Sequence, residues 1–363
     1  MAGFKHSFAL DIGRDACETL RQNQKLLVLE KDVKDFDFSS IGSEPALLAG
    51  GPPCQPFSNA GKHLAKGDPR DCFPHALRAV KALRPKSFVF ENVSGMLRRS
   101  WVEQVTYLIR QLQEPEIPMY RSENWFDHSA RLYRSSLGAS VTGRLRYRVQ
   151  LVKLNAADFG VPQSRNRVIF VGFRDDLNAR WSAPLPTHSI ESLLVSKWIT
   201  FEYWGEHGID PPVVGSRLEI IKAKRALGNP ELLIRQRWAT VRDAIGTLPD
   251  PEKPVGEKNR IRAHEYIPGA RAYVGHSGSI LDFPSKTIKS GVNGIGGGEN
   301  MLCKDDQSVR YFTNLEMLRL QTFPDNYKIS GTRSSVVKQI GNSVPPLLAK
   351  LIGLTIRQSL KRA

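Results

Sequence analysis

The stretch Gly50-Gly51-Pro52-Pro53-Cys54-Gln55-Pro56-Phe57-Ser58 decides how this chain is interpreted. An apolar run, Pro45-Ala46-Leu47-Leu48-Ala49, precedes it and predicts a buried strand of a parallel sheet. Two glycines and two prolines after that strand predict an abrupt, rigid turn with Cys54 at its tip. Open α/β sheets bind ligands beyond the carboxyl ends of their strands. Cys54 is therefore a candidate nucleophile, and the alternative is a buried, inert thiol.

The composition indicates a folded protein with a polyanionic partner. The chain has 363 residues, 40% of them hydrophobic, with 52 Lys and Arg against 36 Asp and Glu, a formal net charge of +16. This length allows one large domain or two ordinary ones, and the excess charge favours nucleic acid as a partner. An ordinary basic protein is the alternative. The four cysteines form no zinc-binding pattern and suit a reducing cytoplasm, and no apolar run is long enough to span a membrane.

Apolar strands alternate with helical segments through the first part of the chain. We predict strands at 8–12, 26–29 and 87–90 and helices at 14–23, 74–83 and 101–112. This rhythm is typical of a nucleotide-binding α/β sheet. Acidic residues follow three of the strands: Asp11, Asp32 and Glu91. Such an acid can accept a hydrogen bond from a ribose hydroxyl, or it can cap a helix. Glu91 is predicted at the same sheet edge as Cys54.

The middle of the chain predicts an insertion and an antiparallel strand pair. Residues 114–143 lack periodicity and carry many arginines, so we expect a surface insertion. Residues 147–154 and 167–173 are β-type runs suited to the edge of the sheet. Between them, Arg165 and Arg167 stand at i and i+2, a spacing that puts both on one face of a strand. Their alternative role is ordinary solvated charge.

The α/β rhythm stops between about residues 174 and 307. This region is rich in Pro, Gly, basic residues and tryptophans such as Trp181, Trp198 and Trp204. Its composition predicts a smaller, irregular or β domain that faces nucleic acid. The glycine cluster at 291–298 is not clearly flanked by a strand and a helix, so a phosphate-binding loop is not predicted.

Three features are predicted after that region. Residues 313–321 form a helix with Thr313 as its N-cap and Glu316 completing a capping box. A tight loop follows at 339–344. Pro345 and Pro346 then open a last helix that runs to about residue 360.

Five segments, in this order, resemble the motifs of bacterial DNA (cytosine-5)-methyltransferases. They are Pro53-Cys54-Gln55, Glu91-Asn92-Val93, Gln163-x-Arg165-x-Arg167, Arg319 to Pro324 and Gly341 to Pro346. One such segment is a modest signal, whereas five in family order are highly specific. The resemblance covers about residues 2–354. It implies an α/β fold with a Rossmann-like, S-adenosylmethionine-dependent methyltransferase sheet and a smaller, irregular or β target-recognition domain. It places the catalytic domain at 1–173, target recognition at 174–307 and a returning C-terminal segment at 308–363.

The resemblance also implies a role for each motif. Cys54 would add to C6 of a flipped-out cytosine, which makes C5 able to attack the methyl group of S-adenosyl-L-methionine. Glu91 would neutralise the ring, while Arg165 would stabilise the adduct and position the base, with Arg167 as a further catalytic residue. Flipping the base out of the duplex costs a few kcal/mol. The other implied contacts are with substrate, at Pro53, Gln55, Ser58 and Gln163, and with cofactor, at Asp11, Asp32, Val33, Asn342 and Ser343.

The sequence departs from the family pattern at two places. Leu315 stands where relatives carry Arg. The chain begins at a point that in relatives follows a central strand and a Phe-x-Gly-x-Gly-Gly loop, which hold the methionine end of the cofactor. We expect a truncated or split form in which two strands face a gap with unpaired backbone groups.

Two functions from different classes therefore stay open. The first is the modification enzyme of a restriction-modification system: a cytoplasmic monomer that acts on double-stranded DNA and has a cognate restriction endonuclease encoded nearby as a partner. The second is an inactive, DNA-binding remnant of such an enzyme. An RNA methyltransferase is a third, less favoured reading. The recognition sequence is not readable from residues 174–307 because base contacts depend on which side chains reach the groove.

Overall fold

The computed structural model describes residues 2–42, 44–53, 72–138, 143–213, 215–253, 256, 261–274, 277–291 and 300–363. Three predicted site residues, Cys54, Gln55 and Ser58, lie outside these ranges. Most of the glycine cluster at 291–298 lies outside them as well.

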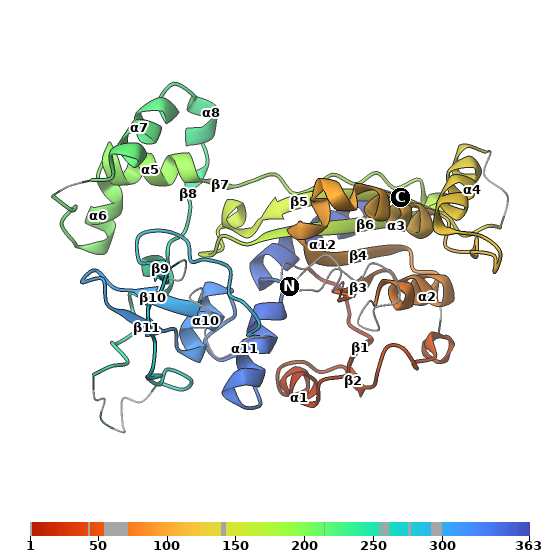
Figure 1. Cartoon of the computed structure of the whole chain (residues 1–363), viewed down its shortest axis with the longest axis horizontal. Coiled ribbons are helices and arrows are strands. Elements are labelled where there is room, and N and C mark those ends of the chain that lie inside the picture. Colours follow the sequence, from red (N-terminus) through yellow and green to blue (C-terminus); the bar gives the residue numbers. More distant parts are fainter. Residues whose placement is uncertain are drawn as a thin grey trace.

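The centre of the molecule is a four-stranded mixed sheet with the order β3-β4-β6-β5 (Figure 1). Its strands are β3 (Leu48–Gly50), β4 (Ser87–Val93), β5 (Tyr147–Asn155) and β6 (Asn166–Arg174). β3 runs parallel to β4, whereas β4 with β6 and β6 with β5 are antiparallel. The predicted antiparallel pair in the middle of the chain is confirmed.

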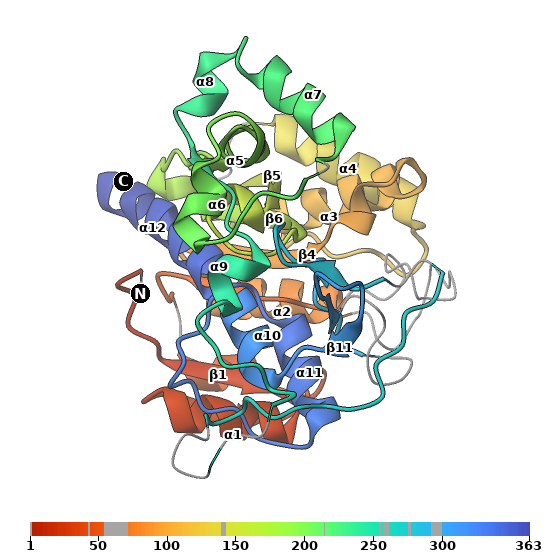
Figure 2. The same ribbon diagram turned by 90° about the vertical axis from the view of Figure 1, so that its left-hand side faces the viewer.

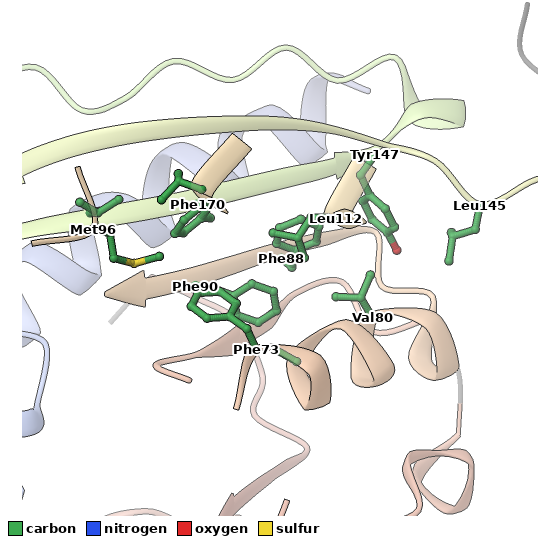
Figure 3. Packing of buried hydrophobic residues seen from close by; sticks show 12 residues of the cluster. Phe73, Val80, Phe88, Phe90, Met96, Leu112, Leu145, Tyr147 and Phe170 are labelled. Carbon is green, nitrogen blue, oxygen red and sulfur yellow. The ribbon is translucent and has the colours of Figure 1, made fainter. Parts of the chain in front are cut away.

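Both faces of this sheet are covered by helices. On one face, Phe88 and Phe90 of β4 and Phe170 of β6 pack with α2 (Phe73–Leu83) and α3 (Val102–Gln113), as Figure 3 shows. On the other face, alternate residues of β6 pack with α12 (Pro346–Arg362). The predicted last helix, opened by Pro345 and Pro346, is thus confirmed, and it buries the second face of the sheet.

Two further strands form a sheet of their own. β1 (Phe8–Asp11) and β2 (Leu27–Glu30) are parallel, and α1 (Arg14–Asn23) follows β1. Figure 1 shows β1 and β2 on the far side of β3 from β4. In the described part of the chain, no ladder joins β1 to β3. Within the described residues, β1-β2 and β3-β4-β6-β5 are therefore separate sheets.

Helices form a lobe in the region predicted to be irregular or β (Figure 2). It contains α5 (Ile190–Trp198), α6 (Glu202–His207), α7 (Arg217–Ala226) and α8 (Pro230–Leu233), joined to the body near the pair β7 (His188–Ser189) and β8 (Gln236–Arg237). Trp204 is buried here with Leu193 and Tyr203, and Trp181 is buried against α12. Our expectation that the tryptophans face nucleic acid is wrong for these two, because their rings supply core volume.

A third body packs around one apolar core. It contains α9 (Val241–Ile245), a sheet with the order β11-β10-β9, α10 (Asn314–Leu320) and α11 (Arg333–Asn342). The strands are β9 (Ser279–Ile280), β10 (Met301–Cys303) and β11 (Val309–Tyr311). This core joins residues from both sides of the predicted limit at 307. The domain limits stay predictions.

Two local predictions concern helices of this body, and one of them is confirmed while the other is partly wrong. The capping box of Thr313 and Glu316 at α10 is confirmed, and Leu315, the departure from the family pattern, is buried in the core. The predicted loop at 339–344 is wrong over residues 339–342, since α11 continues to Asn342.

The insertion at 114–143 contains a helix that the sequence did not predict, α4 (Trp125–Leu137). Asn124 caps it by accepting hydrogen bonds from the amides of Phe126 and Asp127, at 2.9 Å and 3.0 Å. α4 packs beside α3 at the end of the sheet away from the third body (Figure 1). None of the helices in the described ranges has the length and apolar character needed to cross a membrane.

Candidate active site

The segment that carries Cys54 begins and ends at one place on the central sheet. The amide of Cys72 donates to the carbonyl of Pro53 at 3.0 Å, which ties the two ends of the segment together. The side-chain amide of Asn92 donates to the carbonyl of Pro52 at 2.9 Å. Asn92 follows Glu91 in β4, so the base of the segment is fixed to the strand that carries the predicted carboxylate.

Glu91 faces the base of that segment. A Cβ atom added to Gly51 would lie 3.5 Å from Oε2 of Glu91. The other carboxylate oxygen, Oε1, lies 2.5 Å from Nε of Arg167 on the neighbouring strand β6. The two side chains are 15% and 11% exposed. Burial lowers the pKa of Arg167, and the charge of Glu91 opposes that shift. The result is a partly buried ion pair with one carboxylate oxygen directed at Gly51.

Arg165 lies in a different environment from Arg167. Its side chain is fully buried, and its guanidinium donates to the carbonyls of Ile288, Gly341 and Ser343 at 3.2, 2.6 and 2.9 Å. Burial, and then the charge of Arg167, lower the pKa of Arg165 to about 9. β6 begins at Asn166, so the strand alternation that predicted both arginines on one face does not extend to Arg165. The structure thus separates the contacts of the two arginines.

Gln163 is also fully buried. Its amide nitrogen donates to the carbonyl of Leu320 at 3.4 Å, and its amide oxygen accepts from the backbone of Ile288 at 3.2 Å. Backbone bonds with Ser285 flank it on both sides. Gln163 was predicted to bind substrate, but both polar atoms of its side-chain amide form hydrogen bonds with the third body.

Because Gly341 has no side chain, the end of α11 packs closely against the backbone of Lys289 and Ser290. These residues follow Ile288, whose carbonyl Arg165 contacts. A Cβ atom here would lie 2.5 Å from the amide nitrogen of Ser290 and 2.6 Å from the carbonyl carbon of Lys289. Contacts this short force the backbone apart.

We expect Gly341→Ala to lower the free energy of unfolding by about 1–3 kcal/mol because it overpacks this junction. Chemical denaturation measures the change. Gly205→Ala is the matched control: Gly205 is also within a helix, but its added Cβ meets no atom within 4 Å, so equal or higher stability is expected. Equal losses in both variants would show that the junction is not closely packed.

The predicted cofactor residues lie on three elements. Asp11 ends β1 and accepts from the amide of Gly13 at 2.7 Å; Asp32 follows β2 and accepts from the amide of Lys34 at 2.9 Å. Both carboxylates lie beyond the carboxyl ends of neighbouring parallel strands. Val33 packs in the apolar cluster under these strands. Asn342 is exposed at the end of α11, and the carbonyl of Ser343 is taken by Arg165.

A polar contact brings α11 beside α1. The hydroxyl of Thr19 donates to Oε1 of Gln339 at 2.7 Å. In the described ranges, no hydrogen bond joins Asn342 or Ser343 to either aspartate. No set of three or more His, Cys, Asp or Glu side chains in those ranges is placed to hold a metal ion.

Solved structures share this architecture. A DNA modification methyltransferase encoded within an Escherichia coli prophage superposes with a TM-score of 0.57 at 19% identity, over 99% of this chain and 94% of that chain. The Dnmt2 methyltransferase of S. pombe gives a TM-score of 0.53 at 18% identity, over 98% of this chain and 91% of that chain. At these identities the likeness establishes the fold alone. The fold class is that of the Rossmann-like methyltransferases.

Sequence comparison identifies the family within that class. The model of the C-5 cytosine-specific DNA methylases matches residues 1–118 and 140–358. The chain belongs to this family, and by class it is a DNA methyltransferase. The Type II methyltransferase M.NgoMIV of Neisseria gonorrhoeae is 28% identical over 99% of this chain and 93% of its own length. M.PspPI of a Psychrobacter species is 29% identical over 100% of this chain and 76% of its own length.

Proposed function

We propose that the protein transfers a methyl group from S-adenosyl-L-methionine to C5 of a cytosine flipped out of duplex DNA, through a covalent bond between Cys54 and C6. The observation that carries this proposal is the pair of Glu91 and Arg167 beside Gly51, at the base of the segment that bears Cys54. A cation and a carboxyl group on adjacent strands can hold a polar ring at one edge of a sheet. The family to which the chain belongs supports the same reaction.

The chemistry requires four linked changes. The thiolate of Cys54 adds to C6, and the electron pair of the C5–C6 bond moves to C5. Glu91, which takes up a proton as the base binds, gives that proton to N3 and so neutralises the charge that develops on the ring. C5 then attacks the methyl group that the cofactor would supply, and the bond from that methyl group to the sulfonium sulfur breaks, so that the sulfur leaves as a neutral thioether. Removal of the C5 proton by a base restores the double bond and expels Cys54.

The structure supports different roles for Arg165 and Arg167. Arg167 is the one that reaches Glu91, so we assign it the contact with the target base. Arg165 and Gln163 act as positioning residues, because their polar atoms hold the segments at 285–290 and 341–343 against β6. Pro53, Gln55 and Ser58 remain the proposed substrate contacts on the Cys54 segment.

The carboxylates at the strand ends suit the cofactor. Asp11 and Asp32 each use one oxygen for a neighbouring backbone amide, and their second oxygens bond to no other described residue. A carboxylate in this position can accept from a ribose hydroxyl or an adenine amine. We therefore propose that Asp11 holds the ribose and Asp32, with Val33, the adenine. Asn342 and Ser343 would close the same site from α11.

We further propose that the enzyme is the modification half of a Type II restriction-modification system. The relatives M.NgoMIV and M.PspPI are named as Type II methyltransferases. A cognate endonuclease, a monomeric state and a cytoplasmic location complete this proposal. The net charge of +16 suits a duplex DNA substrate.

The proposal predicts the product. Duplex DNA incubated with the protein and methyl-labelled S-adenosyl-L-methionine is expected to yield label only in 5-methyldeoxycytidine after digestion to nucleosides. Label in N4-methyldeoxycytidine or N6-methyldeoxyadenosine would contradict the chemistry, and preferential labelling of a tRNA transcript would favour an RNA substrate.

The alternative function is a DNA-binding remnant without methyl transfer. Salt-sensitive DNA binding in a mobility-shift assay, with no labelled product and no binding of S-adenosyl-L-methionine in calorimetry, would support that function instead. Binding together with 5-methyldeoxycytidine would exclude it.

A further inference from the structure

The helix α4 presents an apolar stripe to solvent. The stripe consists of Phe126, Ala130, Tyr133 and Leu137, and its three large side chains are 57%, 48% and 69% exposed. Their spacing of four, three and four residues puts all four on one narrow side of the helix. Single exposed apolar residues are ordinary, whereas a stripe at this spacing is typical of a helix that packs against another helix.

A different side of α4 holds the helix to the rest of the molecule. Its buried residues are His128, Ser129 and Leu132. Nδ1 of His128 lies 2.7 Å from the hydroxyl of Tyr107 in α3, and Arg110 of α3 donates to the hydroxyl of Ser129 at 2.7 Å. α4 is therefore anchored through this side, while the residues of the stripe stay exposed.

α4 also lies outside the part of the chain that matches the family. The match stops at residue 118 and resumes at residue 140, and α4 lies between these two points. The helix packs beside α3, at the end of the central sheet away from the third body (Figure 1). Methyl transfer is the reaction that the family shares, so a helix added at this place can serve another function.

The residues around the stripe have the composition of a protein-binding surface. Met119 and Tyr120, which precede α4, are 45% and 58% exposed. The centres of protein interfaces are enriched in aromatic residues, Met and Arg. The guanidinium of Arg131 lies over the ring of Tyr120 at 4.2 Å, and that of Arg110 lies over the ring of Tyr133 at 4.8 Å. Rings that are already held in place lose less conformational entropy when a partner binds.

Positive charge borders the stripe. Arg134 is exposed in α4 next to Tyr133, and the exposed Arg144 donates to the hydroxyl of Ser135 at 3.0 Å. Asp127 is the only acid in the sequence of α4. Acidic groups of a partner would therefore meet guanidinium groups beside the apolar contact. A second copy of this chain would bring the same arginines, and each copy carries a net charge of +16.

We propose that the stripe of α4 binds an amphipathic helix of another protein, with acidic residues along the edges of its apolar face. Apolar side chains of that helix would pack against Phe126, Tyr133 and Leu137. Its carboxylates would pair with Arg134 and Arg144. Apolar anchors at intervals of three and four residues are a recurring way in which helices are recognised. The stripe covers about three turns of α4, so the partner helix needs about the same length.

Fluorescence anisotropy of a labelled peptide with the full chain tests this proposal. The probe is a designed helical peptide with leucines at alternating intervals of four and three residues and glutamates at the flanking positions. One control peptide carries lysine in place of each glutamate. A second control has the same residues in an order that breaks the apolar stripe. We expect the acidic helix to bind at least about tenfold more tightly than either control.

Two variants locate the binding site. Leu137→Glu places a charge in the stripe, and Arg134→Glu reverses the charge beside it, so each is expected to weaken peptide binding at least about tenfold. Leu218→Glu is the matched control, because Leu218 is 62% exposed in α7, outside the stripe, and its binding is expected to match the unchanged protein. All three substituted residues are exposed, and circular dichroism checks that the variants stay folded.

The same measurements show whether something else covers the stripe. Equal binding of the three peptides, or unchanged binding by Leu137→Glu, would overturn the proposal. Complete displacement of the acidic peptide by duplex DNA or by anionic lipid vesicles would overturn it too, because the stripe would then belong to one of those surfaces. A dimer of the free protein in sedimentation, separated by Leu137→Glu, would assign the stripe to a second copy instead.

Discussion

Replacing Cys54 with alanine is expected to lower the rate of methyl transfer at least about a thousandfold while DNA binding persists. Without the thiolate, no bond forms at C6, and C5 of cytosine remains too weak a nucleophile to take the methyl group. Transfer of labelled methyl groups to duplex DNA measures the rate, and fluorescence anisotropy measures the binding.

Cys72 provides the matched control for this prediction. It lies at the other end of the same segment, where its amide bonds to Pro53, and this backbone bond survives Cys72→Ala. We expect Cys72→Ala to keep methyl transfer within a few fold of the unchanged protein. Transfer that persists in Cys54→Ala would show that another residue, or no covalent adduct, supports the reaction.

Replacing Glu91 with glutamine is expected to lower kcat by about 10²- to 10⁴-fold, because the amide cannot give a proton to the ring. It also leaves the charge of Arg167 without its partner at 2.5 Å. Breaking an ion pair that is largely buried costs up to about 3 kcal/mol of stability. Denaturant unfolding and single-turnover kinetics measure the two effects separately.

A double variant separates stability from chemistry. In Glu91→Gln combined with Arg167→Met, no uncompensated charge is left, so we expect most of the lost stability to return. Methyl transfer should stay low, since both groups that would contact the base are gone. Recovery of activity together with stability would show that the pair is only structural.

The sequence predicted most of the central sheet because its strands are short apolar runs that end at acids or turns. Two local predictions were less successful. α4 was missed because the segment at 114–143 was interpreted as a whole, and its non-helical parts hide the helical period of residues 125–137, although Asn124 in front of Trp125 is a recognisable cap. Residues 339–342 were predicted as loop because glycine and asparagine disfavour helices. Gly341 is instead required inside α11 by the backbone packed against it.

The sequence predicted individual residues of the site but not most of the contacts that these residues make. The motif spacing brings Glu91 and Arg167 to adjacent strands, and the structure pairs them. The sequence does not show that β6 begins after Arg165, and it therefore did not predict that Arg165 contacts backbone rather than Glu91. Nor did it indicate Asn92 as the tether of the Cys54 segment. Such contacts depend on side-chain directions that a motif does not specify.

The contacts of Arg165 also bear on how the chain matures during synthesis. Its carbonyl partners at Gly341 and Ser343 are 176 and 178 residues further along the chain. A ribosome reaches these partners well after Arg165 itself, at about 5–20 residues per second. Until then the guanidinium of Arg165 cannot be buried, because two of its carbonyl acceptors are missing and a buried cation without partners is strongly unfavourable. The junction between β6 and the third body therefore closes late, so an incomplete nascent chain would not hold an assembled active site near DNA.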